Sequence, residues 1–181
     1  MVVLASRRFL SPAGYLLAAC LFLLPFVGVD FDSPLMRGRA GWSGLDVMVG
    51  GEASVSLDII WYGEGGVLRK EPTTIEGFFG DERAEQFLPH RFLHSQAVAI
   101  AAALMVLAGL LSGVLAGERI QTTVAAVAGL GAAACLSMAQ ARAVEFTGPY
   151  TAPEYGFWLA LCMLLLLGTA NAVHAVRHLR S

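Results

Sequence analysis

Charged residues are scarce in this sequence: Lys, Arg, Asp and Glu make up 14% of its 181 residues. Soluble domains usually carry about 25% charged and about 45–50% apolar residues, whereas 56% of this chain is hydrophobic. Intrinsic disorder is excluded because so apolar a chain cannot stay solvated. The composition is instead typical of a protein that has lipid as its solvent.

Basic residues, cysteines and catalytic motifs are also few. The net charge of −2, without a basic stripe, argues against nucleic acid as a partner. Three cysteines exclude a disulfide-stapled mini-protein, and we expect Cys20, Cys135 and Cys162 to be free, buried thiols within helices. The sequence contains no Cys-x-x-Cys, phosphate loop, Gly-x-Ser-x-Gly or His-Glu-x-x-His motif, so we expect no cofactor.

Long apolar runs are the strongest positive signal. A bilayer core of about 30 Å needs about 20 apolar residues of helix. Four segments qualify, and none has a Lys, Arg, Asp or Glu in its interior: about residues 9–29, 95–116, 122–141 and 155–176. The chain is therefore predicted to be a single integral membrane domain, 1–181, with the fold class of an all-α membrane protein: a four-transmembrane-helix bundle with a small extracytoplasmic cap.

The first apolar segment has three alternative interpretations. Arg7-Arg8 before an apolar run is typical of a signal peptide. The run from Ser6 to Leu10 resembles a twin-arginine signal with one position missing, and Leu17-Ala18-Ala19-Cys20 matches a lipoprotein cleavage box. The apolar run continues past Cys20, however, and no small-x-small cleavage site follows it. We therefore predict an uncleaved helix.

The density of arginines favours an orientation with both termini in the cytoplasm. The predicted outer loop, residues 30–94, is long enough to cross a membrane largely regardless of its charge. The predicted inner arginines all lie in short segments beside helix ends: Arg7, Arg8, Arg119, Arg177 and Arg180. Because much Ala and Gly and a single lysine, Lys70, fit a GC-rich bacterial genome, we expect a multi-pass protein of a bacterial plasma membrane.

The outer loop contains an alternating pattern that predicts a β-hairpin over about residues 45–61. Apolar residues recur at every second position on both sides of Gly50-Gly51, a pair that accepts the positive φ of a tight turn. One face of this hairpin is predicted to be an interface, formed by Val47, Val49, Val55, Leu57, Ile59 and Trp61. A lone hairpin is only marginally stable in water, so this face must pack on the helices or a partner.

Small residues recur at every fourth position in the second and third apolar segments. This spacing lets two helix backbones approach closely in lipid. The predicted helix-packing residues are Gly109, Gly113 and Gly117 in one segment and Ala125, Gly129 and Ala133 in the other. We expect Gly113 to lie against the third apolar helix.

One pair of histidines suggests a metal site. His90 and His94 are four residues apart, so two imidazoles on one helical turn can share a metal ion if both point inward. Pro89 and the intervening Arg91 favour the alternative that both are interfacial side chains at the start of a helix. No carboxylate or lysine lies within the apolar segments, although a proton pump or ion-coupled transporter usually needs one.

The order helix, β-rich outer loop, helix hairpin, short outer loop, helix resembles the claudin-type tetraspan arrangement in topology. Trp42 and Gly44-Leu45 resemble the tryptophan and Gly-Leu signature of that family's first outer loop, whose paired cysteines this chain lacks. The chain is also similar to uncharacterised actinobacterial four-helix membrane proteins, in which a Gly-hydrophobic-Asp strand follows the first helix, here Gly44-Leu45-Asp46. Neither resemblance implies an activity.

These patterns favour a non-catalytic function. We expect a structural or accessory subunit that associates with itself or another membrane complex, with the lipid bilayer as its solvent. One alternative is a small-molecule or ion pathway formed by an oligomer. Another is a metal-dependent membrane enzyme that uses His90 and His94.

Overall fold

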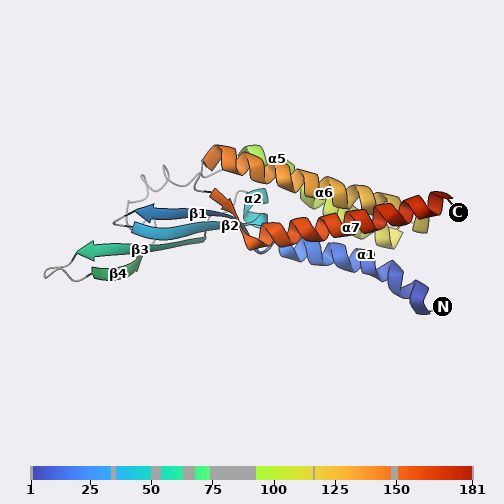
Figure 1. Ribbon diagram of the computed structural model, residues 1–181, viewed down its shortest axis with the longest axis horizontal. Coiled ribbons are helices and arrows are strands. Elements are labelled where there is room, and N and C mark those ends of the chain that lie inside the picture. The colour runs from blue at the N-terminus through green and yellow to red at the C-terminus, as the bar shows by residue number, and fades with distance from the viewer. Residues whose placement is uncertain are drawn as a thin grey trace.

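The computed structural model describes residues 2–33, 36–49, 54–62, 68–73, 93–115, 117–147 and 151–180. Four long helices lie side by side and a β-sheet projects from one end of them (Figure 1). The helices are α1 (Val2–Leu21), α5 (Leu93–Leu115), α6 (Glu118–Thr147) and α7 (Tyr155–Arg180). Both chain termini lie at the end of the helices that is farthest from the sheet.

Each long helix packs against two of the others. Helix α6 contacts α5 on one side and α7 on the other, while α1 contacts both α5 and α7. Three of the helices are long and apolar enough to cross a membrane: α5, α6 and α7. Their apolar stretches, Gln96–Gly113, Ile120–Val144 and Tyr155–Arg177, confirm three of the four predicted segments as helices.

Helix α1 ends earlier than the sequence predicted. The apolar run continues to Val29, but the helix ends at Leu21 and strand β1 (Pro25–Ser33) takes over. Successive i→i−3 bonds form a tight turn, in which Phe22 N–H donates to the Ala19 carbonyl at 3.2 Å. Pro25 stops the helix because it has no N–H to donate and disfavours helical geometry at the residue before it. The prediction of one helix through residue 29 was therefore wrong.

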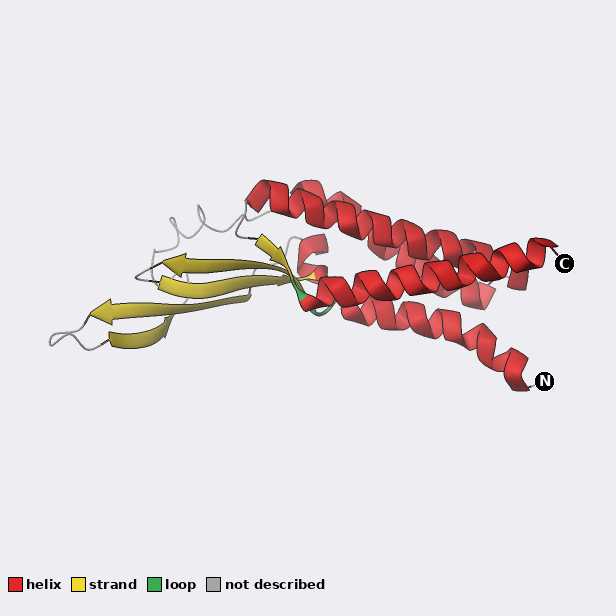
Figure 2. Ribbon diagram, viewed as in Figure 1, coloured by secondary structure: helices red, strands yellow, loops and turns green. Residues whose placement is uncertain are grey.

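The sheet has five antiparallel strands in the order β4-β3-β2-β1-β5 (Figure 2). Strands β2 (Met36–Ser43), β3 (Ser54–Tyr62) and β4 (Leu68–Thr73) follow β1 in the first loop of the chain. The fifth strand, β5 (Thr151–Pro153), lies between α6 and α7 and pairs with β1 through Val27 and Pro153. The cap is thus a sheet built from two loops rather than a small hairpin.

The predicted hairpin over residues 45–61 was wrong in its first half. Residues Gly44–Val49 form a short helix, α2, and β3 pairs with β2 and β4 instead. The helix begins at a reciprocal cap: the Asp46 N–H donates to Ser43 Oγ at 3.1 Å, and the Ser43 N–H donates to Asp46 Oδ2 at 2.9 Å. Such a box satisfies backbone donors that the first helical turn leaves unpaired. Gly44-Leu45-Asp46 is consequently the start of a helix and not a strand.

Candidate functional site at the junction of helices and sheet

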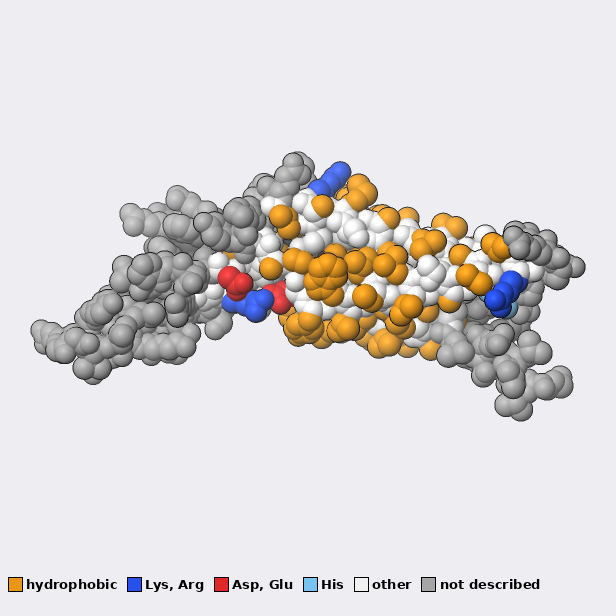
Figure 3. All heavy atoms as spheres, in the orientation of Figure 1, with side chains coloured by type: hydrophobic (Ala, Val, Ile, Leu, Met, Phe, Trp, Pro, Cys, Tyr) orange, Lys and Arg blue, Asp and Glu red, His pale blue; other side chains and the backbone are white. Residues whose placement is uncertain are grey.

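Large apolar side chains cover the outside of the long helices. Figure 3 shows this hydrophobic surface over the helical part of the molecule, with charged side chains towards its two ends. Soluble monomers rarely expose contiguous apolar patches of more than a few hundred square ångströms. The surface includes Leu104, Leu111, Ile120, Val127, Met138, Trp158, Leu159, Leu166 and Val173.

Charged groups mark the sheet end of this apolar surface. The guanidinium of Arg39 in β2 lies 3.5 Å from Asp30 Oδ1 in β1, and its other arm donates to Glu154, the residue before α7. The Glu154 side chain is 11% exposed and packs over Gly28, where a Cβ atom would collide with its carboxylate. The Arg39–Glu154 pair thereby connects the second strand to the start of the last helix.

The separation of polar ends along α7 matches the thickness of a bilayer. Its apolar stretch, Tyr155–Arg177, contains 23 residues. At a rise of about 1.5 Å per residue it is about 35 Å long, a little more than the hydrocarbon core of about 30 Å. Glu154 at one end and Arg177 at the other are thus spaced to reach both interfaces.

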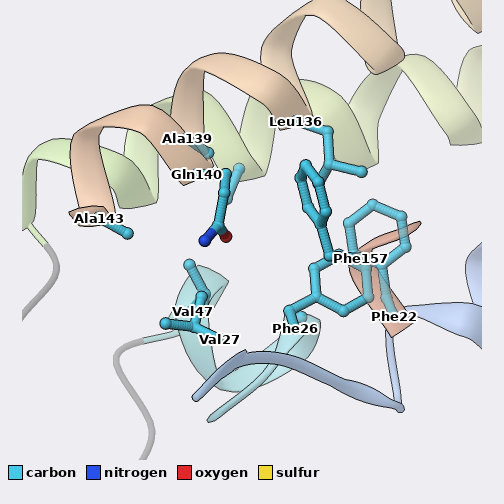
Figure 4. A pocket seen from close by; sticks show the side chains of 11 residues that line it. Phe22, Phe26, Val27, Val47, Leu136, Ala139, Gln140, Ala143 and Phe157 are labelled. Atoms are coloured by element: carbon cyan, nitrogen blue, oxygen red, sulfur yellow. The ribbon is translucent and has the colours of Figure 1, made fainter. Parts of the chain in front are cut away.

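A partly enclosed pocket lies beneath the sheet, where α2, the start of β1 and three helices meet (Figure 4). Three aromatic rings form one side of it: Phe26 is 5.1 Å from Phe22 and 6.3 Å from Phe157 between ring centroids. Small side chains of α5 and α6 leave the space open. The lining consists of Phe22, Phe26, Val27, Gly44, Val47, Ala99, Leu136, Ala139, Gln140, Ala143 and Phe157.

Gln140 is the only polar side chain in that lining. Its side chain points from α6 towards Val27 and Val47. The residue is 9% exposed, and its Nε2 atom is buried without a hydrogen-bond partner. Leaving a buried donor unsatisfied costs about 1–3 kcal/mol, so this amide is the least satisfied polar group found among the described side chains.

The small-residue stripes lie at helix contacts, but the partner of α5 differs from the prediction. A Cβ atom on Gly109 would lie 2.6 Å from the Tyr15 ring, and one on Gly113 would collide with Pro12. Both glycines therefore face α1 and not α6. A Cβ on Gly117 would meet nothing within 4 Å, so this residue takes no part in the packing.

The stripe of α6 faces two helices. Ala125 and Ala133 are buried, and a Cβ on Gly129 would lie 2.7 Å from Tyr15 Oη and 2.8 Å from the Gly168 backbone of α7. Tyr15 itself is 0% exposed, and its hydroxyl donates to the Ala125 carbonyl. One aromatic side chain of α1 is thus inserted between α5 and α6, where glycines leave room for it.

The remaining predicted site residues are dispersed. Val47 is 6% exposed and Val49 is 69% exposed, both on α2, so they do not share a strand face with β3. The other four predicted interface residues occupy alternate positions of β3: Val55, Leu57, Ile59 and Trp61. His90 and the side chain of His94 lie outside the described residues. Among the described side chains, no group of three metal-ligating residues is present.

Three structural features were not recognised in the sequence: the Tyr15 contact, the Arg39–Glu154 pair and the Gln140 pocket. Each joins residues more than 100 positions apart or depends on the position of α2. Gln140 was visible only as one polar residue in an apolar segment. The cysteines also differ in part from expectation, since all three are free but Cys20 and Cys162 are exposed on their helices.

No model of a known protein family matches this chain, and no curated protein matches it. The function is therefore inferred from the geometry of the chain. It shows three helices long and apolar enough to cross a membrane and a small sheet attached to one end of the helical part.

Proposed function

We propose that this chain is a non-catalytic, four-span protein of a bacterial plasma membrane. It acts as a structural or accessory subunit whose sheet contacts a partner outside the cytoplasm. One observation carries the proposal: strands from both loops form a single sheet that projects from one end of an apolar helical body. The order of these elements also supports a topological likeness to claudin-type tetraspan proteins.

The position of α1 supports four spans. Its apolar stretch, Ser11–Leu21, packs against α5 and α7, and the whole helix has 20 residues. The apolar stretch alone is about 16 Å long at about 1.5 Å per residue, about half of a bilayer core, so its packing against α5 and α7 is what supports a fourth span. The last helix is joined to it by Asn171, whose Nδ2 lies 3.4 Å from Ser11 Oγ. With four spans, both termini lie on one side of the membrane and the sheet on the other, and the density of arginines beside the helix ends assigns the termini to the cytoplasm.

The filling of the helical part favours an accessory role over a small-molecule or ion pathway. Its largest fully buried side chains are Tyr15, Val106 and Leu164, all of them uncharged. The hydroxyls of Ser112 and Ser137 donate to carbonyls of their own helices, so they do not line a polar path. Among the described residues, every buried polar side chain is uncharged.

The sheet face is a better contact surface than its β4 edge. Strand β4 carries Arg69, Lys70 and Glu71 together with Pro72, which has no N–H to pair. Charges and proline on an edge strand oppose pairing with another chain. We therefore assign partner contact to a face of the sheet, for which β3 supplies the apolar candidates Val55, Leu57, Ile59 and Trp61.

The orientation is tested by labelling single cysteines on intact cells with an impermeant maleimide. Ser6, Ser54 and Ser181 are replaced one at a time in a variant without the three native cysteines. We expect labelling at Ser54 alone, and at all three positions after the cells are opened. Labelling of Ser6 or Ser181 on intact cells contradicts the proposed topology.

The partner contact is tested with a photo-crosslinking amino acid at neighbouring positions of one strand. Val55 and Ser56 are consecutive residues of β3, and consecutive positions of a strand lie on opposite faces of a sheet. We expect a discrete crosslinked species from Val55 and little from Ser56, and mass spectrometry then identifies the second chain. Equal crosslinking from both positions, or none from either, contradicts a specific sheet-face contact.

A further inference from the structure

We propose that the pocket beneath the sheet binds the carbonyl group of a membrane lipid acyl ester, with the Gln140 amide as its hydrogen-bond donor. This inference rests on the membrane insertion proposed above. Its starting point is an unpartnered, nine-tenths buried amide nitrogen aimed into an apolar pocket.

The chemistry of the lining defines the missing group. Gln140 Nε2 carries two N–H donors and no acceptor, so the group opposite it must supply an acceptor oxygen. The rest of the lining is made of aromatic, aliphatic and alanine side chains. An occupant therefore needs an acceptor on an otherwise apolar body, which describes an acyl carbonyl.

A water molecule fits this lining less well. The cavity volume is about 10 Å³, enough for about one water molecule. A buried water usually makes about three hydrogen bonds, but Gln140 is the only polar side chain here. Two nearby backbone carbonyls each already accept one hydrogen bond: Phe22 O from the Leu45 N–H and Phe26 O from the Glu154 N–H, at 2.9 Å each.

The depth of the pocket fits an ester group. It lies between the apolar surface of the helices and the Arg39–Glu154 pair, because Phe26 and Phe157 stand within a few residues of Gly28 and Glu154. That level corresponds to the boundary between acyl chains and headgroups, where ester carbonyls lie. The cavity admits only the carbonyl, so the acyl chain runs outside it, over exposed apolar side chains.

The test compares ester lipids with ether lipids, which lack the carbonyl. The full chain is reconstituted in vesicles that contain equal amounts of dioleoyl phosphatidylglycerol and its di-O-alkyl analogue. It is then purified in mild detergent, and retained lipids are quantified by mass spectrometry. We expect an ester-to-ether ratio of about 5, the factor that corresponds to one net hydrogen bond.

Gln140→Met removes the donor and keeps the length of the side chain, so the ratio should fall to about 1. Gln121→Met is the matched control, because Gln121 is also a buried glutamine of α6 and lies outside the pocket. This control should keep the wild-type ratio. Ratios that are equal in the wild type and in Gln140→Met overturn the proposal and leave water as the occupant.

Thermal midpoints give a second readout that does not depend on lipid retention. In ether lipid, Gln140→Met should melt at or above the wild type, since it removes an unsatisfied buried donor. In ester lipid the thermal midpoint of the wild type should rise relative to that of the variant. A difference between the two proteins that is the same in both lipids overturns the proposal, even if one protein is less stable.

Two further measurements distinguish failure of the lipid site from failure of membrane insertion. Adding palmitic acid shows whether a free fatty acid supplies the carbonyl; preferential retention of the acid over the ester contradicts the ester as the source. Flotation of the vesicles and resistance to alkaline extraction measure membrane insertion. A chain that fails to insert overturns the proposed function, whereas a chain that inserts but does not discriminate ester from ether overturns only the lipid site.

Discussion

The helical part and the sheet of this protein are held together by different interactions. Between the helices, backbones approach at glycines and alanines, and one buried side chain, Tyr15, fills the space that they leave. In the sheet, backbone hydrogen bonds join five short strands, and a capped helix and an ion pair fasten it to the helices. Packing between the helices therefore depends on side-chain volume, whereas the sheet depends on backbone pairing and on polar contacts at the starts of α2 and α7.

This difference has consequences for mutations. A side chain of changed volume between helices cannot be accommodated without displacing its neighbours or leaving a cavity, because protein interiors are close-packed. A change at the junction with the sheet removes one polar interaction from a region where water can replace it. We therefore expect substitutions in the helical part to lower stability more than substitutions at the junction.

The largest effect is expected for Tyr15→Ala. The ring lies between Gly109 and Gly129 and its hydroxyl donates to the Ala125 carbonyl. Deleting a buried aromatic side chain typically costs about 3–5 kcal/mol, and Tyr15→Phe, which removes only the hydrogen bond, should cost about 1 kcal/mol. Unfolding in detergent measures both. A Phe variant as unstable as the Ala variant contradicts a role based on volume.

The next effect concerns two glycines of α6 that are two residues apart. Gly129→Val places atoms against the Gly168 backbone, which cannot move aside, and should cost about 1–3 kcal/mol or more by overpacking. Gly131→Val is the matched control, because its Cβ would meet only the flexible end of Met105. The thermal midpoint should fall clearly for Gly129→Val alone. Equal midpoints show that α6 and α7 do not approach at Gly129.

A smaller effect is expected where the sheet joins α2. Ser43→Ala removes the oxygen that accepts the Asp46 N–H and should cost about 1 kcal/mol, as for other N-caps. Faster hydrogen exchange over Gly44–Val49 measures the loss. Ser137→Ala should change little, because its hydroxyl only donates to a carbonyl of its own helix. Unchanged exchange in Ser43→Ala contradicts the cap.

The smallest effect is expected for the Arg39–Glu154 pair. The Arg39 side chain is 54% exposed, and exposed ion pairs contribute about 0–1 kcal/mol. A double-mutant cycle with Arg39→Gln and Glu154→Gln isolates the interaction. We expect a coupling free energy of less than about 1 kcal/mol that decreases further in 1 M salt. A value above about 2 kcal/mol makes the junction as strongly held as the helices and contradicts the contrast between the two regions.

Local sequence signals explain which parts of the fold were predictable. Continuous apolar runs identified α5, α6 and α7, because spanning lipid requires length and the absence of charge. The end of α1 was mispredicted because the apolar run continues past Pro25 to Val29, although proline predicts the end of a helix. The α2 segment was mispredicted because its alternating apolar residues predict a strand, and the Ser43–Asp46 cap that begins the helix was not recognised in the sequence.

The candidate site was less predictable, because its members are distant in sequence. The spacing of Gly109 and Gly113 predicted close packing, but it fits either neighbouring helix. Only their contacts with Tyr15 and Pro12 show that they face α1. Similarly, Gln140 becomes notable only when Val27 and Val47 lie opposite it. Spacing along one helix defines a face of that helix but not what covers it.

By itself, the sequence determined where this protein is apolar and where α5, α6 and α7 run, because these depend on the solvent and on nearby residues. Only the tertiary structure decided which helices meet at the glycines, that β5 joins a sheet with β1, and that an amide is left unpaired beneath that sheet. The reason is geometric. Contacts between Tyr15 and Ala125, or between Arg39 and Glu154, need segments more than 100 residues apart to be fixed in space, and no local preference encodes that.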